Sequence, residues 1–492
     1  MKPTVVFQDR SEDPERFHQR CLRAAAALRG LGVREGDVVA LMMRNSPGLL
    51  ELMLAARWIG AYWCPINWHF KADELRHILG DCGTRLLIAD ADLLQQLGDV
   101  APAGVRVLAA TPSAGHGSWQ ALRDAAAPIE APARLPRGPM LYTTGTTGRP
   151  KGIRREPPTP AQAAGSQDKL RRVLGAEPGM RALVSAPLYH SAPNSFAVTA
   201  ALHDALLVIE PRFDPEETLR LIEAHRLTHA YLVPTMYVRL LRLPDEVRRR
   251  YDLSSMRFVS STGSPCPSEV KRAMIAWWGP VIHEAYGSSE LGYMTLLDSH
   301  DALRKPGSAG RLLEGVQLRI LDEGRRELPR GQAGLIYVRQ DTLTEFTYND
   351  NDAARRAMEV DGFLTMGDVG YLDEDGFLFI VDRAADMVIS GGVNIYPAEI
   401  EAMLMTMPGV ADCAVFGIPD AEFGEGLAAA VQCAPGAALA AAQVQAFLKA
   451  RLAGYKVPSI VSFHAELPRE DTGKIFKRRL REPYWQGVGR RI

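Results

Sequence analysis

A stretch of glycine, threonine and basic residues between residues 140 and 154 constrains the fold more than any other part of the chain. It begins with an apolar run, Met140 to Tyr142, that is typical of a buried strand, and continues as Thr143-Thr-Gly-Thr-Thr-Gly-Arg-Pro-Lys-Gly152. Glycines let a backbone approach a ligand closely, and amide, hydroxyl and ammonium groups all donate hydrogen bonds to phosphate oxygens. The pattern predicts a loop that follows a strand and binds a polyphosphate.

This stretch differs from the common P-loop, which reads G-x-x-x-x-G-K followed by Ser or Thr. Pro150 stands five residues after Gly145, and Gly152 follows Lys151. A nucleotide site of a different kind is therefore indicated. The alternative is a surface loop without a ligand, since loops are often rich in glycine and polar residues, and the other stretches of the chain must decide between the two.

Length, charge and cysteine content exclude several classes of protein. A chain of 492 residues is expected to form two or three domains. Its 57 Lys and Arg residues against 58 Asp and Glu residues give no electrostatic case for nucleic acid or an anionic membrane as partner. The six cysteines include no C-x-x-C pair, and no apolar stretch is long enough for a signal peptide or a membrane span. We therefore expect a soluble, cytoplasmic protein without an integral membrane segment.

Apolar periodicity alternates between helix and strand from the N-terminus to Ala285, which predicts an α/β fold with parallel strands. The helices are expected at 14–32, 49–60, 72–79 and 216–225. The strands are expected at 38–42, 62–66, 85–88, 181–185, 206–209, 229–233, 257–261 and 281–285. Ligands gather at the carboxyl ends of such strands. Short runs of alanine elsewhere favour helix.

The pattern changes after residue 306. Short strands between glycine-rich turns predict a β-rich subdomain at about 306–381 that is attached to the rest. A hinge is expected at 382–386, followed by a compact α+β unit at 387–492, with helices at 397–405 and 441–452 and a strand at 411–418. The predicted architecture is thus a large N-terminal domain of α/β layers, 1–381, and a small, mobile C-terminal lid.

Three polar turns that follow predicted strands are candidates for a binding site. His190, in Pro187-Leu-Tyr-His-Ser-Ala-Pro-Asn194, could line a pocket, although a histidine at a strand end is more often structural. The turns at 261–265 and 286–290 contain glycine and could contact a flat base, with the ring of Tyr286 available for stacking. Glu290 could hold Mg²⁺ near phosphates, or could be a carboxylate at a helix N-terminus.

Two further candidates lie late in the chain. Asp368, after Gly367, could accept hydrogen bonds from ribose hydroxyls, while Arg383 and Asp386 could form only a surface ion pair. Lys474 follows a flexible Thr-Gly turn, and the alternative for this region is a solvated basic tail.

Together these stretches resemble the adenylate-forming superfamily of acyl-CoA synthetases, adenylation domains and luciferases over nearly the whole chain. The resemblance rests on five motifs in the order that the family has them: 142–152, 286–290, 367–368, 382–383 with 391–400, and 471–474. It implies that a carboxylate attacks the α-phosphate of Mg-ATP, which leaves acyl-AMP and pyrophosphate. A thiol, that of CoA, then attacks the acyl-AMP.

The resemblance also implies a role for each matching residue. The phosphates would be held by Thr143, Thr144, Gly145, Thr146, Thr147 and Lys151. Adenine would be framed by Gly263, Ser264, Pro265, Tyr286, Gly287 and Ser288. Ribose would be held by Asp368 and Arg383, Mg²⁺ by Glu290, and the carboxylate and α-phosphate by Lys474. His190 would stand beside the acyl carboxylate, and lid rotation would remove Lys474 and bring Gly391 and Gly392 toward the pantetheine channel.

The chain departs from the family pattern at the hinge, where Ala385 stands at a position that is commonly Lys or Asp. Ser191 follows His190, so the aspartate with which amino-acid-activating relatives hold an ammonium group is missing. We therefore expect a fatty or aromatic acid as substrate, with ATP and CoA, and a homodimer is possible. The alternatives are an acyl-AMP ligase that loads a carrier protein, and a non-catalytic sensor of ATP or acyl-AMP. Pocket walls are expected at Tyr189, Thr235, Gly263, Gly292 and Met294.

Overall fold

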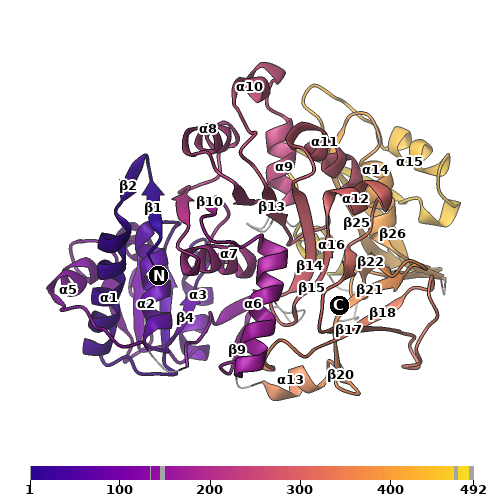
Figure 1. The fold of residues 1–492 in the computed structure, drawn as a ribbon. Helices are drawn as coiled ribbons and strands as arrows, with labels where there is room; N and C mark the ends of the chain where they lie inside the picture. Colours follow the sequence, from indigo (N-terminus) through magenta and orange to yellow (C-terminus); the bar gives the residue numbers. More distant parts are fainter. Residues whose placement is uncertain are drawn as a thin grey trace.

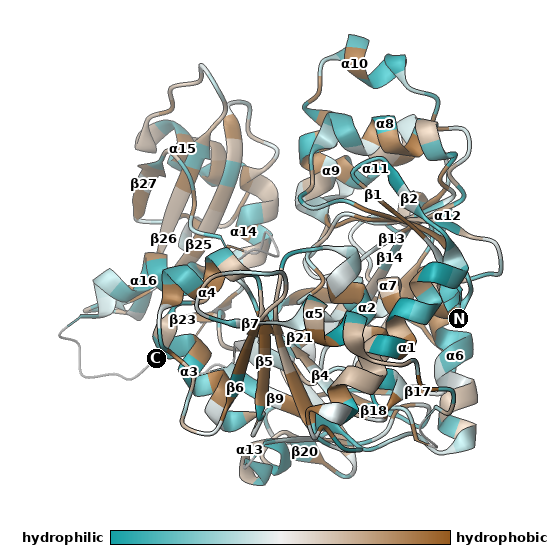
Figure 2. Cartoon of the chain, turned by 90° about the vertical axis from the view of Figure 1, so that its left-hand side faces the viewer, coloured by the Kyte–Doolittle hydropathy of each residue, from teal (hydrophilic) through white to brown (hydrophobic). Residues whose placement is uncertain are grey.

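The computed structural model describes residues 2–132, 135–144, 150–349, 351–391, 393–469 and 475–486. At residues 144 and 394 it describes the backbone alone. It is an α/β protein in which a large mixed sheet and a smaller parallel sheet are followed by a separate C-terminal domain (Figure 1). Figure 2 shows this last domain as a lobe of its own, at the upper left. The predicted α/β fold class with a small additional C-terminal domain is confirmed.

The first sheet is parallel throughout and has the order β4-β3-β5-β6-β7. Strands β3, β4 and β5 are apolar and buried throughout, as expected for strands covered on both faces (brown in Figure 2). The strands of this sheet are β3 (Val38–Met42), β4 (Tyr62–Pro65), β5 (Leu86–Ala89), β6 (Arg106–Ala109) and β7 (Gly117–Ser118). The helices of this region are α1 (Pro14–Gly30), α2 (Pro47–Trp58), α3 (Ala72–Asp81), α4 (Ala91–Leu97) and α5 (Trp119–Ala125).

The large sheet has a parallel half and an antiparallel half. The parallel half contains β1 (Thr4–Phe7), β10 (Arg181–Val184), β11 (Leu206–Ile209), β12 (His229–Tyr231), β13 (Phe258–Ser261) and β14 (Ile282–Ser288), with β2 (Arg10–Glu12) antiparallel at its edge. The helices of this half are α6 (Pro160–Leu174), α7 (Ser191–Leu202), α8 (Pro215–His225), α9 (Pro234–Leu241), α10 (Asp245–Arg250), α11 (Ser268–Trp278) and α12 (Ser299–Arg304).

The antiparallel half continues the same sheet without a break, because β15 pairs with β14 and β16 pairs with both β15 and β22. It consists of β15 (Gly292–Leu297), β16 (Gly310–Leu312), β17 (Val316–Leu321), β18 (Gly334–Gln340), β20 (Glu359–Val360), β21 (Phe363–Leu372) and β22 (Phe377–Arg383), with α13 (Asp352–Arg356) beside it. Most of the segment expected to be β-rich is therefore an extension of the large sheet.

A small third sheet carries the glycine- and threonine-rich stretch. β8 (Leu141–Thr144) pairs antiparallel with β9 (Pro150–Arg155), and β9 pairs with β19 (Phe346–Tyr348). The loop that we expected over the whole polar stretch is thus shorter, because Lys151 and Gly152 lie in β9. A Cβ on Gly152 would stand only 2.8 Å from the hydroxyl of Tyr142 on the neighbouring strand, so a larger residue here would require this side chain to move.

The C-terminal domain has its own sheet and core. Its strands are β23 (Val388–Ser390), β24 (Val393–Ile395), β25 (Val410–Asp420), β26 (Gly424–Cys433) and β27 (Ile460–His464). Its helices are α14 (Pro397–Leu404), α15 (Ala441–Lys449) and α16 (Lys477–Trp485), with a 3₁₀ turn at Gly454–Lys456. The alanine run at 428–430 is strand and not helix, because β26 pairs with β25 on one side and β27 on the other.

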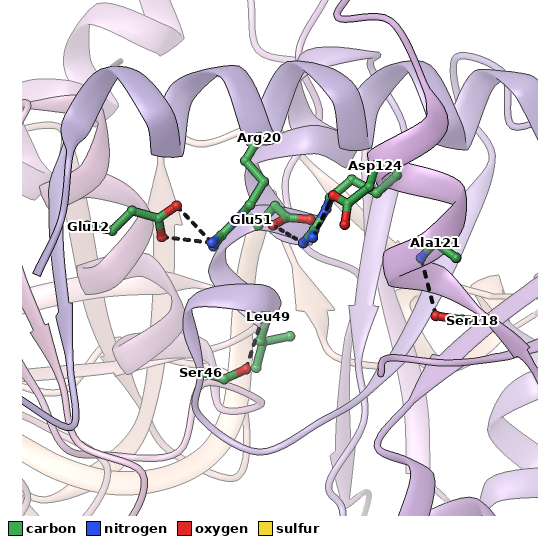
Figure 3. Close-up of polar contacts among 9 residues, drawn as sticks. Glu12, Arg20, Ser46, Leu49, Glu51, Ser118, Ala121 and Asp124 are labelled. Atoms are coloured by element: carbon green, nitrogen blue, oxygen red, sulfur yellow. Dashed lines mark hydrogen bonds and ion pairs between the residues drawn. The ribbon is translucent and has the colours of Figure 1, made fainter. Parts of the chain in front are cut away.

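A buried carboxylate ties three helices of the N-terminal region together (Figure 3). Glu51 of α2 is fully buried, forms an ion pair with Arg20 of α1, with 2.5 Å between Nε and Oε2, and accepts a hydrogen bond from Arg123 of α5 at 3.0 Å. Burial raises the pKa of Glu51, and the two guanidinium groups oppose that rise. Arg20 also binds Glu12 through Nη1. These pairs hold α1, α2 and α5 in register.

None of the helices in the described ranges is long and apolar enough to cross a bilayer.

A second buried carboxylate makes stability depend on pH. Burial raises the pKa of Glu210 to about 7 from an ordinary value of 4.5, so the folded state favours the protonated form. Its contribution to stability is therefore complete below about pH 4.5 and is lost as the pH rises through 7. Because glutamine resembles the protonated carboxyl, Glu210→Gln is expected to raise the free energy of unfolding at pH 8 by up to about 3 kcal/mol.

Thermal unfolding of both proteins at pH 5 and pH 8 measures this effect. We expect the Tm difference between the variant and the parent to be large at pH 8 and to shrink at pH 5. The control is Glu323→Gln, which removes a charge from an exposed turn. An equal Tm difference at both pH values would contradict the assignment.

Candidate active site

A cleft of about 2070 Å³ lies between the large sheet, helices α6 and α7, and the C-terminal domain. Residues at or just beyond the carboxyl ends of β12, β13 and β14 line it, as expected for an open α/β sheet: Tyr231, Val233, Thr262, Gly263, Gly287 and Ser288. The β8–β9 hairpin supplies Thr143 and Lys151. Arg469 and Phe476 line the cleft from the C-terminal domain, so residues far apart in the sequence share one cavity.

Glu290 stands at the centre of a polar cluster. Its side chain is buried, and Oε1 accepts hydrogen bonds from the hydroxyls of Thr143 at 3.0 Å and Tyr348 at 3.1 Å. The ammonium of Lys151 lies 5.3 Å from the centre of the Tyr348 ring. Glu290 lies between β14 and β15, so the alternative of a helix N-terminus is wrong.

The geometry of Glu290 suits a cation. Both hydroxyl hydrogen bonds go to Oε1, and within the described ranges no residue donates to Oε2. A carboxylate with one free oxygen at the wall of a phosphate-sized cleft fits Mg²⁺, which prefers one or two carboxylates together with phosphate and water oxygens.

Arg155 fixes the turn that carries Glu290. Its guanidinium donates to the backbone carbonyls of Glu290, of Ser289 at 3.1 Å and of Thr344 at 2.5 Å. Burial lowers the pKa of Arg155 to about 10, and the carboxylate of Glu290 opposes this shift. Arg155 was not predicted from the sequence, because all three of its partners lie far from it along the chain and no local sequence pattern indicates these contacts.

Asp368 and Arg383 face each other on adjacent strands. Arg383 Nε donates to Asp368 Oδ1 at 3.1 Å, and the hydroxyl of Tyr286 donates to Oδ2 at 2.6 Å. Burial and the nearby Asp368 carboxylate raise the pKa of Tyr286. Arg383 therefore pairs with Asp368, and not with Asp386 in the surface ion pair considered above. The group joins β14, β21 and β22 at the edge of the cleft.

The two turns expected to frame a base lie close together but differ in form. Gly263 follows β13, lines the cleft and has a φ of 100°, which favours glycine. Ser264 and Pro265 follow it and are not part of the cleft wall. The prediction of a turn over 286–290 is wrong for its first part, because Tyr286 to Ser288 belong to β14 and the turn follows at 289–290. A Cβ on Gly287 would overlap the carbonyl of Gly292 on β15, so this close pairing requires glycine.

Two buried asparagines hold the segment that carries His190. Asn45 donates to the carbonyl of Ala186 at 2.9 Å and accepts from the amide of Leu188 at 2.9 Å. Asn194 donates to the carbonyl of Leu188 at 2.8 Å. His190 precedes the first residue of α7 and lines the cleft. Asn45 was not predicted, because it belongs to a much earlier part of the chain than the turn that it supports.

The residues that line the cleft match the predicted pocket-wall residues only in part. Tyr189, Gly263 and Gly292 line the cleft, whereas Thr235 and Met294 do not. Their sequence neighbours Met236 and Tyr293 line it in their place. On β15 the reason is strand alternation, since residues next to each other point to opposite faces and Met294 faces the core.

A group of buried and half-buried charges lies at and near the segment predicted to be a hinge, 382–386. Asp382 accepts from the backbone amides of Arg383 at 2.8 Å and of Ala398, at the start of α14, at 2.9 Å. Lys477 of α16 pairs with Glu401 at 2.8 Å. Burial alone would lower the pKa of Lys477, but the carboxylates of Glu401 and Asp382 raise it. These contacts join the last strand of the large sheet to the C-terminal domain.

Ala385 supplies a backbone contact at the hinge. Its carbonyl accepts from Nη1 of Arg481 at 3.3 Å. Gly391 has a φ of 56° and donates to the carbonyl of Phe423 at 2.9 Å, and it is not part of the cleft wall.

Some predicted site residues lie outside the described residues: Gly145, Thr146, Thr147, Gly392 and Lys474. The side chain of Thr144 is also not described. The residues that flank the segment 470–474 line the cleft, since Arg469 and Phe476 belong to its wall, and a bridge pairs Arg469 with Ile475.

Comparison with known proteins identifies relatives over nearly the whole chain. A family model described as AMP-binding enzyme matches residues 2–346, and one described as AMP-binding enzyme C-terminal domain matches residues 399–474. A feruloyl-CoA synthase from Amycolatopsis is 34% identical, with 95% of this chain and 92% of the relative covered. A long-chain-fatty-acid–CoA ligase from Mycobacterium tuberculosis is also 34% identical, with 94% and 91% covered.

A solved structure agrees with this result. ATP-bound MatB from Rhodopseudomonas palustris superposes with a TM-score of 0.88 at 31% identity, and the match covers 99% of this chain and 97% of that protein.

Proposed function

Because the chain belongs to the family of AMP-binding enzymes, in the branch of the acyl-CoA synthetases, we propose that it activates a carboxylic acid through the residues of the cleft. The acid would attack the α-phosphate of ATP to give acyl-AMP and pyrophosphate. The thiol of CoA would then take the acyl group and release AMP. The relatives act on feruloyl and long-chain fatty acyl groups by name, which supports a fatty or aromatic acid as substrate.

One observation carries the assignment of residues to this chemistry. The hydroxyl of Thr143 binds the carboxylate of Glu290, which lies far along the chain, and Lys151 lies over the Tyr348 ring in the same cluster. Phosphate donors and a buried carboxylate thus meet in one cleft. A loop without a ligand does not need hydroxyl and ammonium donors beside a buried carboxylate, whereas a site for Mg-ATP needs both.

Within this proposal each group has a separate task. Thr143 and Lys151 donate to phosphate oxygens, and Asp368, held by Arg383 and Tyr286, accepts from the ribose hydroxyls. Gly263 and the β14 residues Tyr286 to Ser288 flank the adenine. His190 stands beside the acid. Lys474 donates to the carboxylate and the α-phosphate, where negative charge accumulates as the two anions meet.

Glu290 is the residue that would hold Mg²⁺, and Arg155 keeps it in place through the backbone carbonyls of the turn. When bound, the metal neutralises phosphate charge. Thr143 and Tyr348 orient the carboxylate by hydrogen bonds to a single oxygen.

We also propose that the C-terminal domain, residues 387–492, is a lid that rotates about residues 382–386. Arg469 and Phe476 line the cleft and Gly391 does not, which supports an arrangement suited to the adenylation step. Rotation would withdraw Lys474 and bring Gly391 and Gly392 to the channel for the pantetheine of CoA. All six cysteines are free thiols, which supports a reducing, cytoplasmic location.

A screen of AMP release over acids of graded chain length and aromaticity, with and without CoA, tests the function. We expect AMP release that requires the acid, ATP and CoA together. Acid-dependent pyrophosphate exchange without CoA turnover would instead favour a ligase that loads a carrier protein. ATP binding without either reaction would favour a sensor.

A further inference from the structure

A buried lysine in the wall of the cleft has no task in the reaction proposed above. Lys169 of α6 is 8% exposed, lines the cleft and donates from Nζ to Oε1 of Gln340 at 2.5 Å. Burial lowers its pKa to about 8, so the side chain still carries its proton at neutral pH. Gln340 is neutral and does not balance the charge of this ammonium, while the carboxylate of Asp341 opposes the effect of burial on its pKa.

Gln340 is held so that its oxygen faces the lysine. Its Nε2 donates to the backbone carbonyls of Leu291 and, at 2.9 Å, of Tyr293. With both amide hydrogens engaged, only the carbonyl oxygen is left for Lys169. The hydrogen bond between Lys169 and Gln340 is therefore fixed in its orientation by the other hydrogen bonds of Gln340.

Helix α6 is fixed against the same segment by further contacts. Ser166 Oγ donates to the carbonyl of Thr342 at 2.9 Å, and a Cβ on Gly165 would overlap the Thr342 side chain. Residues 165, 166 and 169 share one face of the helix. The position of the ammonium is therefore set before any ligand enters.

Lys169 has donors to spare. Its ammonium has three N–H donors, and Gln340 is its one acceptor within the described part of the chain. The hydroxyls of Tyr293 and Thr342 belong to the same cleft wall, are buried, and have no hydrogen-bond partner among the described residues. Other parts of the wall are apolar, with Val198, Leu202, Val233 and Met236. An acceptor oxygen from a ligand would satisfy the remaining donors of Lys169.

Lys169 borders the same cleft as the Glu290 cluster. Its partner Gln340 donates to the backbone carbonyl of Leu291, the residue that follows Glu290. An acid bound in this cleft would therefore present a second polar group to Lys169.

We propose that Lys169, held by Gln340, binds an oxygen-bearing group of the substrate, so that the preferred acid carries a carboxylate or a carbonyl in addition to the reacting carboxylate. The proposal rests on the function proposed above, because it takes the cleft to be the acyl site. A plain alkyl or aryl group would leave Gln340 as the one described acceptor for the three N–H donors of this buried ammonium, which is unfavourable.

The test compares three acids of equal length that end in methyl, in a methyl ketone and in carboxylate: octanoate, 7-oxooctanoate and octanedioate. AMP release gives kcat/KM for each acid with the parent protein, Lys169→Met, Lys169→Arg and the exposed control Arg171→Met. The oxygen-bearing acids are expected to exceed octanoate by about 10- to 100-fold in the parent. Lys169→Met should remove this preference, and Lys169→Arg should retain part of it.

A binding measurement separates this proposal from the function itself. The rise in Tm caused by octanedioate, without ATP or CoA, should be present in the parent and in Arg171→Met and absent in Lys169→Met. A preference for octanoate in the parent, or a ratio of kcat/KM values that Lys169→Met leaves unchanged, would overturn the role of Lys169 while the ligase function stands. Absence of AMP release with every acid would instead contradict the proposed function.

Discussion

Lys474→Ala is expected to lower the rate of ATP-dependent acyl-AMP formation by about 10²- to 10³-fold, because the variant loses a donor to charge that develops in the transition state. Thioester formation from supplied acyl-AMP should stay within a few-fold of the parent, since the α-phosphate has already reacted. Acid-dependent pyrophosphate exchange measures the first half-reaction, and CoA-thioester formation from synthetic acyl-AMP measures the second.

The control for this experiment is Lys449→Ala, which removes an exposed lysine from α15 of the same domain. It should leave both half-reactions unchanged. If Lys474→Ala slows the two half-reactions equally, its effect comes from the domain as a whole, and the separate role in adenylation is wrong.

Glu290→Gln is expected to reduce adenylation by about 10²-fold or more, because it removes the charge that would hold Mg²⁺ but keeps an oxygen for the hydroxyls of Thr143 and Tyr348. The Mg²⁺ concentration required for half-maximal activity should rise. Titration of pyrophosphate exchange with Mg²⁺ at saturating ATP measures both changes. Since the hydrogen bonds are retained, the Tm should change little.

Glu345→Gln is the matched control, because this carboxylate is exposed and directly precedes β19, the strand that carries Tyr348. It should keep the parent's Mg²⁺ dependence. A Glu290→Gln protein with normal Mg²⁺ dependence and reduced stability would show that Glu290 serves the fold alone.

The regular parts of the fold were predictable because local apolar patterns coincide with burial. The strand expected at 206–209 has these bounds in the structure, and strand pairing among β10 to β14 is parallel as expected. β26 could not be predicted in this way. Its alanines favour helix on their own, and only pairing with β25 and β27 makes them strand.

The candidate site was predictable where a motif is contiguous in sequence. Glu290, Asp368 and Arg383 stand in recognisable stretches, and their described side chains lie at or beside the cleft. Arg155 and Lys169 belong to no such stretch. Their partners Ser289 and Gln340 are distant along the chain, so their environment exists only after folding. Residues whose proposed roles depend on partners distant in sequence, such as Arg155 and Lys169, are therefore harder to predict than those of contiguous motifs.

The pairing of β9 with β19 has a consequence for how the protein is made. Arg154 and Thr347 are partners in this sheet, so the hairpin that carries Thr143 and Lys151 is completed by a strand that is synthesised much later. Contacts of such sequence separation form late and slowly, because a long loop must close first. During synthesis the β8–β9 hairpin therefore stays incomplete until most of the large sheet has left the ribosome, and a nascent chain that ends before Tyr348 lacks the strand that completes the proposed ATP site.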